Sequence, residues 1–265
     1  MDDKPLFEIR DISFYFGQVK AIDGLSLTIP AGCFLGILGP NGCGKSTLLE
    51  LLAGCRKAGS GTIKYRGRDI RDYPARDLAK KIAFVPQDFY IDFSFTVKEI
   101  VLMGRHPYIP RFASPSPRDL EIVDQVMGLL NLEKLKDKYI TGLSGGEKQR
   151  VIFARALAQD TPVLLLDEAT SNMDIRYTLE ILDIVAMSVK TMGKTVVAAI
   201  HDLNLAAVYC DMLAFMKSGR VVSQGSIDDV LTGDNLRQVF GIKGHIYFDD
   251  YAGSKRVIFA RKNHE

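Results

Sequence analysis

A glycine-rich segment near the N-terminus constrains the fold of this 265-residue chain more than any other feature. Residues 39–46 (GPNGCGKS) fit the pattern G-x(4)-G-K-[ST], and they lie between an apolar run at 34–38 and a helical stretch at 45–52. In such a strand, loop and helix, the backbone N–H groups and the helix N-terminus can face phosphate oxygens. Lys45 would then reach the terminal phosphates, and the Ser46 hydroxyl would bind Mg²⁺.

A glycine-rich turn without a ligand is the alternative interpretation of this segment. The motif and its strand-to-helix context agree with each other, which favours phosphate binding. The residues that we expect to contact a nucleotide here are Gly39, Pro40, Asn41, Gly42, Cys43, Gly44, Lys45, Ser46 and Thr47.

The composition is that of a globular protein. Hydrophobic residues make up 47% and charged residues 25% of the chain, and 23 glycines and 10 prolines are too few for a disordered or collagen-like sequence. The formal net charge is only +2, so the chain carries no strong electrostatic field. We therefore expect no nucleic-acid partner.

Cysteine usage and apolar runs indicate the compartment. The four cysteines show no CxxC spacing and are too few for a disulfide scaffold, which predicts free thiols in a reducing environment. The first ten residues (MDDKPLFEIR) lack the apolar core of a secretory signal, and the longest apolar runs have the length of a strand. The sequence predicts a soluble chain on the cytoplasmic side.

Strand and helix signals alternate at both ends of the chain. Short β-rich segments are predicted at residues 7–14, 25–29, 34–38, 61–65 and 82–85. The continuous apolar runs at 163–166 and 195–200 are separated by a helical stretch at 175–192, which is typical of parallel strands buried on both faces. Further strands are predicted at 212–217 and 220–223, followed by a helix capped by Ser226 and a hairpin at 246–259.

The middle of the chain differs from both ends. From about residue 87 to residue 160 the pattern is helical, interrupted by a proline-rich loop at 106–117. We therefore predict an α/β fold in which residues 1–86 and 161–265 form a mixed, largely parallel sheet with flanking helices. An antiparallel β subdomain at the N-terminus and a helical subdomain at residues 87–160 complete this prediction.

Two adjacent carboxylates end the apolar run at 163–166. Asp167 and Glu168 should point in different directions, because side chains alternate along a strand. Asp167 suits the Mg²⁺ shell, directly or through water, and Glu168 suits a general base that polarises the attacking water. Such pairs also occur as ordinary turn or cap residues, but the glycine-rich motif upstream favours the catalytic interpretation.

A second glycine pair follows Leu143. Residues 143–147 (LSGGE) open a helix that is predicted to run to about Gln159, and Ser144 is suited to cap it. The flexible backbone at Gly145 and Gly146 can also present amides to an anion. Standing alone, the pentapeptide would be an ordinary capped helix.

Taken together, these motifs resemble the ATP-binding subunits of ABC transporters. The resemblance rests on residues 39–46, LSGGE, the run LLLDE that ends at Glu168, Gln87 after one apolar strand and His201 after another, in the family's order over nearly the whole chain. It implies a P-loop NTPase core, ATP hydrolysis with Mg²⁺, and a homodimer in which two copies sit head to tail. Each nucleotide would lie between the glycine-rich loop of one copy and LSGGE of the other.

The resemblance also implies roles for single residues. Gln87 matches the glutamine that senses Mg²⁺ and the attacking water, His201 matches the histidine that contacts the γ-phosphate, and Asp174 matches a loop that crosses the dimer interface. Phe16 occupies the place of the aromatic residue that stacks on adenine, with Tyr15 as the alternative. The remaining residues that the resemblance assigns to nucleotide binding are Ser144, Gly145, Gly146 and Glu147.

Two positions depart from the family pattern. Ala169 stands where proline commonly follows the catalytic glutamate, and Asn172-Met173 stand where the crossing loop commonly has Ala-Leu. Neither change removes a phosphate ligand or the general base, so these departures concern rate and interface detail.

Three further segments, at residues 96–108, 201–211 and 231–241, resemble the subfamily that imports iron chelates, haem and cobalamin. The resemblance implies two transmembrane permease subunits, an extracellular or periplasmic binding protein, and a place at the cytoplasmic face of the cell membrane. Importers of zinc, manganese or molybdate have similar segments, and amino-acid importers stay open as well. A soluble ABC ATPase of cofactor assembly is the alternative from another class.

Overall fold

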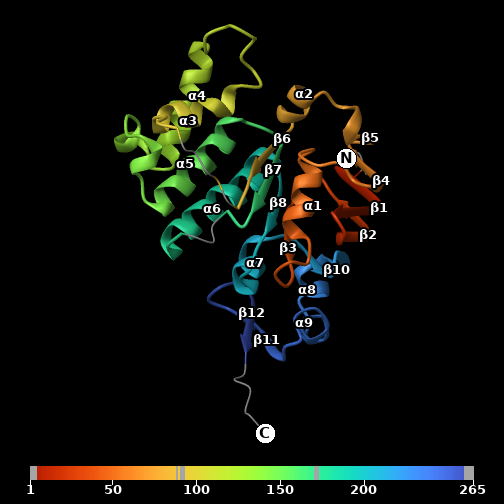
Figure 1. The fold of residues 1–265 in the computed structure, drawn as a ribbon. Helices are drawn as coiled ribbons and strands as arrows, with labels where there is room; N and C mark the ends of the chain where they lie inside the picture. Colours follow the sequence, from red (N-terminus) through yellow and green to blue (C-terminus); the bar gives the residue numbers. More distant parts are fainter. Residues whose placement is uncertain (1–4, 88, 90–92, 170–172, 260–265) are drawn as a thin grey trace.

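The structure is a computed structural model that describes residues 5–87, 89, 93–169 and 173–259. Asn172, the first residue of the Asn172-Met173 pair that departs from the family pattern, lies outside the described residues. Two main sheets and a small C-terminal hairpin are arranged so that helices α3, α4 and α5 lie at one end of the molecule and the hairpin at the other (Figure 1).

Six strands form the central sheet in the order β10-β9-β3-β8-β7-β6. All neighbours pair in parallel except β10, which joins β9 antiparallel. Parallel neighbours need long crossovers, and these are supplied by the helical segments between the strands. The strands are β3 (Phe34–Leu38), β6 (Ile82–Val85), β7 (Val163–Asp167), β8 (Thr195–Ala199), β9 (Met212–Lys217) and β10 (Arg220–Ser226).

A second sheet is entirely antiparallel, with strand order β2-β1-β4-β5. The C-terminal hairpin pairs β11 with β12. These strands are β1 (Phe7–Phe16), β2 (Val19–Ile29), β4 (Ser60–Tyr65), β5 (Arg68–Asp69), β11 (Gly244–Asp249) and β12 (Ser254–Phe259). The mixed α/β fold with an N-terminal antiparallel sheet is therefore confirmed.

Helices connect and cover the sheets. Between β6 and β7 the described residues form α3, α4, α5 and short 3₁₀ turns, with one isolated bridge between Thr96 and Tyr139. No helix within the described residues combines the length and the apolar character that a membrane crossing requires. The α-helices are α1 (Lys45–Leu52), α2 (Ala75–Ala79), α3 (Val97–Leu102), α4 (Pro117–Leu129), α5 (Gly145–Ala158), α6 (Ile175–Met192), α7 (Leu203–Tyr209), α8 (Ile227–Val230) and α9 (Gly233–Phe240). The 3₁₀ turns are η1 (Ile70–Asp72), η2 (Met103–Arg105), η3 (Glu133–Leu135) and η4 (Ile140–Gly142).

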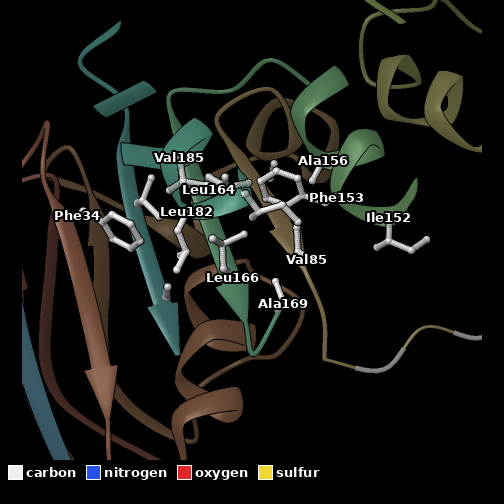
Figure 2. Packing of buried hydrophobic residues seen from close by; sticks show 14 of the residues in the cluster. Phe34, Val85, Ile152, Phe153, Ala156, Leu164, Leu166, Ala169, Leu182 and Val185 are labelled. Atoms are coloured by element: carbon white, nitrogen blue, oxygen red, sulfur yellow. The ribbon is translucent and has the colours of Figure 1, made fainter. Parts of the chain in front are cut away.

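The central sheet is buried on both faces, as the continuous apolar runs predict. In β7, Leu164 and Leu166 pack into one hydrophobic cluster with residues of α5 and α6, such as Phe153 and Leu182 (Figure 2). Their neighbours in β7 face the opposite side, where a second cluster joins α1 and the antiparallel sheet. Each fully buried leucine contributes roughly 2 kcal/mol of transfer free energy, so both layers hold the sheet in place.

Several strand ends differ from the prediction. β1 continues to Phe16, beyond the end of the segment predicted at 7–14. β2 begins at Val19, before the start of the segment predicted at 25–29. Lys20, Asp23 and Gly24 have low β propensity, but pairing with β1 overrides that local preference. β10 also runs three residues beyond the predicted end at residue 223, again because it pairs with its neighbour.

A buried ion pair links the helices between β6 and β7. The Arg105 Nε donates to Asp119 Oδ1 at 2.9 Å, and the Arg105 Nη1 donates to the Ala158 carbonyl at the end of α5. Both charged side chains are more than nine-tenths buried. Asp119 also accepts hydrogen bonds from Ser116, which caps α4, and these hydrogen bonds lower the pKa of the carboxyl group, with Arg105 adding to the effect. The pair thus fixes α4 against the helix that LSGGE opens.

We predict that Asp119→Ala lowers the free energy of unfolding by about 3 kcal/mol, because it leaves the buried Arg105 charge without its opposite charge. Urea unfolding followed by circular dichroism would measure this loss. The matched control is Glu121→Ala in the same helix, which removes a solvent-exposed ion pair with Arg118 and should cost less than about 1 kcal/mol. Equal losses in the two variants would contradict the role given to the buried pair.

Candidate functional site

The loop between β3 and α1 is enclosed by the backbone of its neighbours. A Cβ added at Gly39 would lie 2.2 Å from the carbonyl oxygen of Met216 in β9, so no larger residue fits without displacing the loop. Gly44, the N-cap of α1, has a φ of 104°, which an L-residue with a side chain rarely adopts. The glycines of the motif are therefore required by space at one position and by backbone conformation at the other.

The Lys45 side chain lies inside this loop. It is buried, and its Nζ donates to the carbonyl of Gly39 at 3.0 Å and of Pro40 at 3.4 Å. Gly219 stabilises the loop, because its N–H donates to the Cys43 carbonyl at 3.0 Å. Cys43 is buried as well, and burial raises the pKa of its thiol. The ammonium is thus placed where an anion bound in the loop would meet it.

Ser46 and Asp167 meet at the start of α1 and the end of β7. The Ser46 Oγ donates to Asp167 Oδ1 at 2.9 Å. Burial, with the nearby negative charge of Glu168, raises the pKa of Asp167 to about 6, and the Ser46 hydrogen bond opposes this rise only in part. A hydroxyl and a buried carboxylate are ligands that fit Mg²⁺, which binds through few protein oxygens together with phosphate oxygens.

Glu168 is the meeting point of three strand ends. Its Oε2 accepts a hydrogen bond from Gln87 Nε2 at 2.8 Å, and its Oε1 contacts the Nε2 of His201. These residues follow β7, β6 and β8, whose carboxyl ends lie side by side in the parallel sheet. Glu168 itself has a φ of 48°, a left-handed conformation that turns the chain away from Asp167. Sequence analysis predicted different directions for the two carboxylates, and the structure gives them different partners.

A cavity of about 500 Å³ brings most of the predicted residues together. Phe16 and Glu168 both line it, while Tyr15 does not. Three residues that sequence analysis did not name, Val19, Lys20 and Ala21, also face the cavity. The remaining lining residues are Asn41, Gly42, Gly44, Lys45, Ser46, Thr47, Gln87 and His201.

LSGGE lies elsewhere on the described surface. Ser144 is exposed and caps α5, with its Oγ accepting from the Glu147 N–H, while the Glu147 Oε2 accepts from the Ser144 N–H and hydroxyl at 2.8 Å. These hydrogen bonds lower the pKa of Glu147. The cavity lining includes none of the four described residues 144–147. The predicted contact of Ser144, Gly145, Gly146 and Glu147 with nucleotide therefore cannot be made within one copy in this conformation.

Asp174 is exposed at the N-cap of α6, outside the cavity. A second hollow of about 410 Å³ lies beside it, between Met173 and Leu205, and shares Glu168 and His201 with the first cavity. The site around Glu168 and His201 is thus open on the side of the molecule where α6 and α7 begin.

The geometry suits the hydrolysis of a phosphoanhydride bond. A buried ammonium inside an amide-rich loop can hold phosphates, a hydroxyl and carboxylate pair can hold Mg²⁺, and a carboxylate with two polar partners can orient water. The cavity extends from these groups to an aromatic ring, which suits a planar base.

Comparison with known proteins places these features in a family. Residues 22–171 match the family model for the ABC transporter domain. The chain is 40% identical to the cobalamin import ATP-binding protein BtuD of Halobacterium salinarum over 94% of its own length, although it spans only 62% of that protein. It is 34% identical to the petrobactin import ATP-binding protein YclP of Bacillus subtilis, with 89% of this chain and 92% of the relative covered. It is 36% identical to the hemin import ATP-binding protein HmuV of Bradyrhizobium diazoefficiens, with 92% of both chains covered.

Solved structures agree with this placement. A chain of an ABC transporter assigned to the metal-chelate type, in an inward-facing conformation, superposes with a TM-score of 0.82 at 30% identity, covering 97% of this chain and 98% of that one. The bacterial ABC transporter cassette MJ0796, solved as a dimer, gives a TM-score of 0.75 at 27% identity, covering 83% of this chain and 98% of that one. Because the family model matches more than half of the chain and two of these relatives are covered over 92% of their length, the chain belongs to the ABC transporter family of ATP-binding proteins.

Proposed function

We propose that this chain hydrolyses ATP to energise a membrane importer whose cargo is an iron–siderophore complex, haem or cobalamin. The observation that carries the hydrolytic part is a cavity lined by Lys45, Ser46 and the cluster around Glu168, with Asp167 hydrogen-bonded to Ser46 just outside the lining. In this proposal, residues 1–86 and 161–265 form the nucleotide-binding core, and residues 87–160 form the helical subdomain that carries LSGGE.

Each residue at the phosphate end has a distinct task. Lys45 binds the β- and γ-phosphates, and His201 donates a hydrogen bond to the γ-phosphate. Glu168 accepts a proton from the attacking water, and Gln87 keeps the Glu168 carboxylate oriented through the hydrogen bond seen between them. Ser46, Asp167 and Gln87 would hold Mg²⁺, which neutralises negative charge on the phosphates when it is bound. Because the base and the phosphate-binding groups come from different strand ends, small shifts between them alter the rate.

The site is completed by a second copy of the chain. Ser144, Gly145 and Gly146 are accessible at the start of α5 but do not line the cavity of their own copy. A head-to-tail dimer would place their amides and the N-terminus of α5 against the γ-phosphate held by the other copy. Asp174, exposed beside the open hollow, would lie in the same interface. Support comes from MJ0796, which has been solved as a dimer and as a dimer with ADP and Pi.

The importer role and its cargo are supported by relatives. Proteins named for the import of cobalamin, petrobactin and hemin align with almost the whole of this chain, as do others named for ferric enterobactin and iron(3+)-hydroxamate. We therefore place the chain at the cytoplasmic face of the cell membrane, bound to two permease subunits. A substrate-binding protein outside the membrane would deliver cargo to the permease without contacting this chain.

Other importers and one soluble class are the alternatives. Zinc, manganese or molybdate importers would use the same ATPase chemistry, because cargo is recognised by other chains. A soluble ABC ATPase of cofactor assembly would also share the cavity. The names of the relatives favour the metal-chelate and cobalamin group over both alternatives.

The first prediction from the proposed function tests the role of Glu168 as the general base. Glu168→Gln should keep ATP binding but lower the turnover number by about 10² to 10⁴, the usual contribution of a general base. Phosphate release and nucleotide titration on the same preparation would separate the two effects. Glu121→Gln, an identical change at an exposed carboxylate of α4, is the control and should leave both unchanged. Turnover in Glu168→Gln that matches this control would remove Glu168 from the mechanism.

The second prediction tests the shared site. Ser144→Arg places bulk and charge where the other copy's phosphate should lie, so ATP-dependent dimerisation should be lost while the cavity of each copy stays intact. Light scattering of a Glu168→Gln background with and without ATP would show the change in mass. Mixing Ser144→Arg with Lys45→Ala should restore hydrolysis, because the mixed dimer holds one intact site. A mixture as inactive as its components would contradict the head-to-tail arrangement.

The third prediction tests the importer. When the chain is isolated from detergent-solubilised membranes of its native host, mass spectrometry should identify a many-helix permease in equal amount. The pocket of that permease can then be tested for binding of an iron chelate, haem or cobalamin. Recovery from the soluble fraction alone, with partners that contain no membrane helices, would instead favour the ATPase of cofactor assembly.

A further inference from the structure

Arg56 covers one face of the aromatic ring that borders the cavity. The guanidinium carbon of Arg56 lies over Phe16 at 4.7 Å from the ring centroid. Phe16 lines the cavity, whereas Arg56, which the structure also describes, does not. The guanidinium therefore contacts the ring from outside the lining of the cavity.

The position of Arg56 is set by the helix that follows the phosphate-binding loop. Its Nε donates to the carboxylate of Glu50 in α1, and its backbone N–H donates to the Glu50 carbonyl at 3.3 Å. This return of the chain is made at Gly54, whose φ is 73° and whose added Cβ would lie 2.5 Å from the side chain of Leu78. Arg56 is thus anchored twice to α1 and once to an aromatic ring of β1.

A second ring completes the support of Phe16. The edge of one ring faces the other in the Phe14–Phe16 pair, with centroids 5.0 Å apart and planes at 82°, and the Arg56 guanidinium also lies 5.7 Å from the Phe14 ring centroid. Phe16 ends β1 beside a glycine turn and is 44% exposed, so without these contacts its ring would be free to rotate. Together, the guanidinium and Phe14 fix the plane of the ring.

We propose that Arg56 is a positioning residue for base recognition, which holds Phe16 so that the free face of the ring stacks on the purine of ATP. This inference rests on the proposed ATP-binding function and adds a residue to it. Stacking on a ring that is already ordered avoids the entropic cost of ordering it on binding. A planar guanidinium is suited to the far face, because it stacks on aromatic rings and its charge attracts their π electrons.

Nucleotide affinity with and without a base tests this role. The probes are MgADP and magnesium pyrophosphate, neither of which is turned over, and their dissociation constants are measured by calorimetry on the full chain. Arg56→Ala should weaken ADP binding about fivefold to tenfold and change pyrophosphate binding by less than about twofold. Phe16→Ala should act on ADP alone in the same way, and the double variant should lose no more than Phe16→Ala does. Arg56→Lys keeps the charge without the planar group and should restore part of the ADP affinity.

The chain offers a matched control in the same sheet. Arg68 lies over the Tyr73 ring at 4.6 Å from its centroid and takes no part in the cavity. Arg68→Ala removes an equivalent stack and should leave both dissociation constants within about twofold of the parent. Thermal unfolding of all variants checks that they are folded.

The outcomes separate this inference from the proposed function. If the parent binds neither ADP nor pyrophosphate in the presence of Mg²⁺, the proposed ATP site is wrong. If the parent binds both and Arg56→Ala weakens them equally, Arg56 supports α1 rather than the base, and the inference is overturned. Unchanged ADP affinity in Arg56→Ala, or in Phe16→Ala, overturns it as well.

Discussion

The hydrogen bond from Ser46 to Asp167 joins the two parts of the structure on which the site depends. Ser46 belongs to the first turn of α1, which continues the phosphate-binding loop, and Asp167 ends β7, a buried strand between β6 and β8. Because β6 and β8 flank β7 in parallel, Gln87 and His201 reach the same edge as Glu168. Burial raises the pKa of Asp167 at this edge, and the Ser46 hydrogen bond opposes part of that rise.

The proposed chemistry is divided between two surfaces, the cavity and the N-terminus of α5. The Ser144 hydroxyl and the Glu147 carboxylate satisfy each other through a capping box, so their polar groups need no ligand in a separate copy. The Gly145 and Gly146 backbone remains accessible, with no atom within 4 Å of an added Cβ at either position. The N-terminus of α5 is therefore stable in a separate copy and accessible to an anion. In the proposed dimer, two copies can pair and separate without unfolding this helix.

Sequence patterns predicted the fold class and the main strands and helices well, and the geometry of the site less well. Buried runs and the G-x(4)-G-K-S segment are local signals, so β3, α1, β7 and the ends that carry Asp167 and Glu168 could be placed from the sequence. The Gln87–Glu168–His201 cluster needed the family resemblance, since its members are up to 114 residues apart in the chain and meet only through parallel pairing. Lys20 and Arg56 carried no signal, because exposed basic residues are common and their neighbours are set by tertiary contacts. The alternation of side chains in β1 decides between Phe16 and Tyr15, but only once the pairing of that strand is known.

One short helix connects the phosphate-binding loop to the contacts that support Phe16. α1 starts at Lys45 and Ser46, and its last turns position Glu50 and, through it, Arg56 beneath Phe16. Glu50 follows Lys45 by five residues, roughly 7.5 Å along the helix axis at 1.5 Å per residue. The helix thus fixes the distance between the phosphate-binding loop and the anchor of Arg56. In the proposed function, base stacking and phosphate binding would be coupled through the backbone of α1 as well as through the ligand.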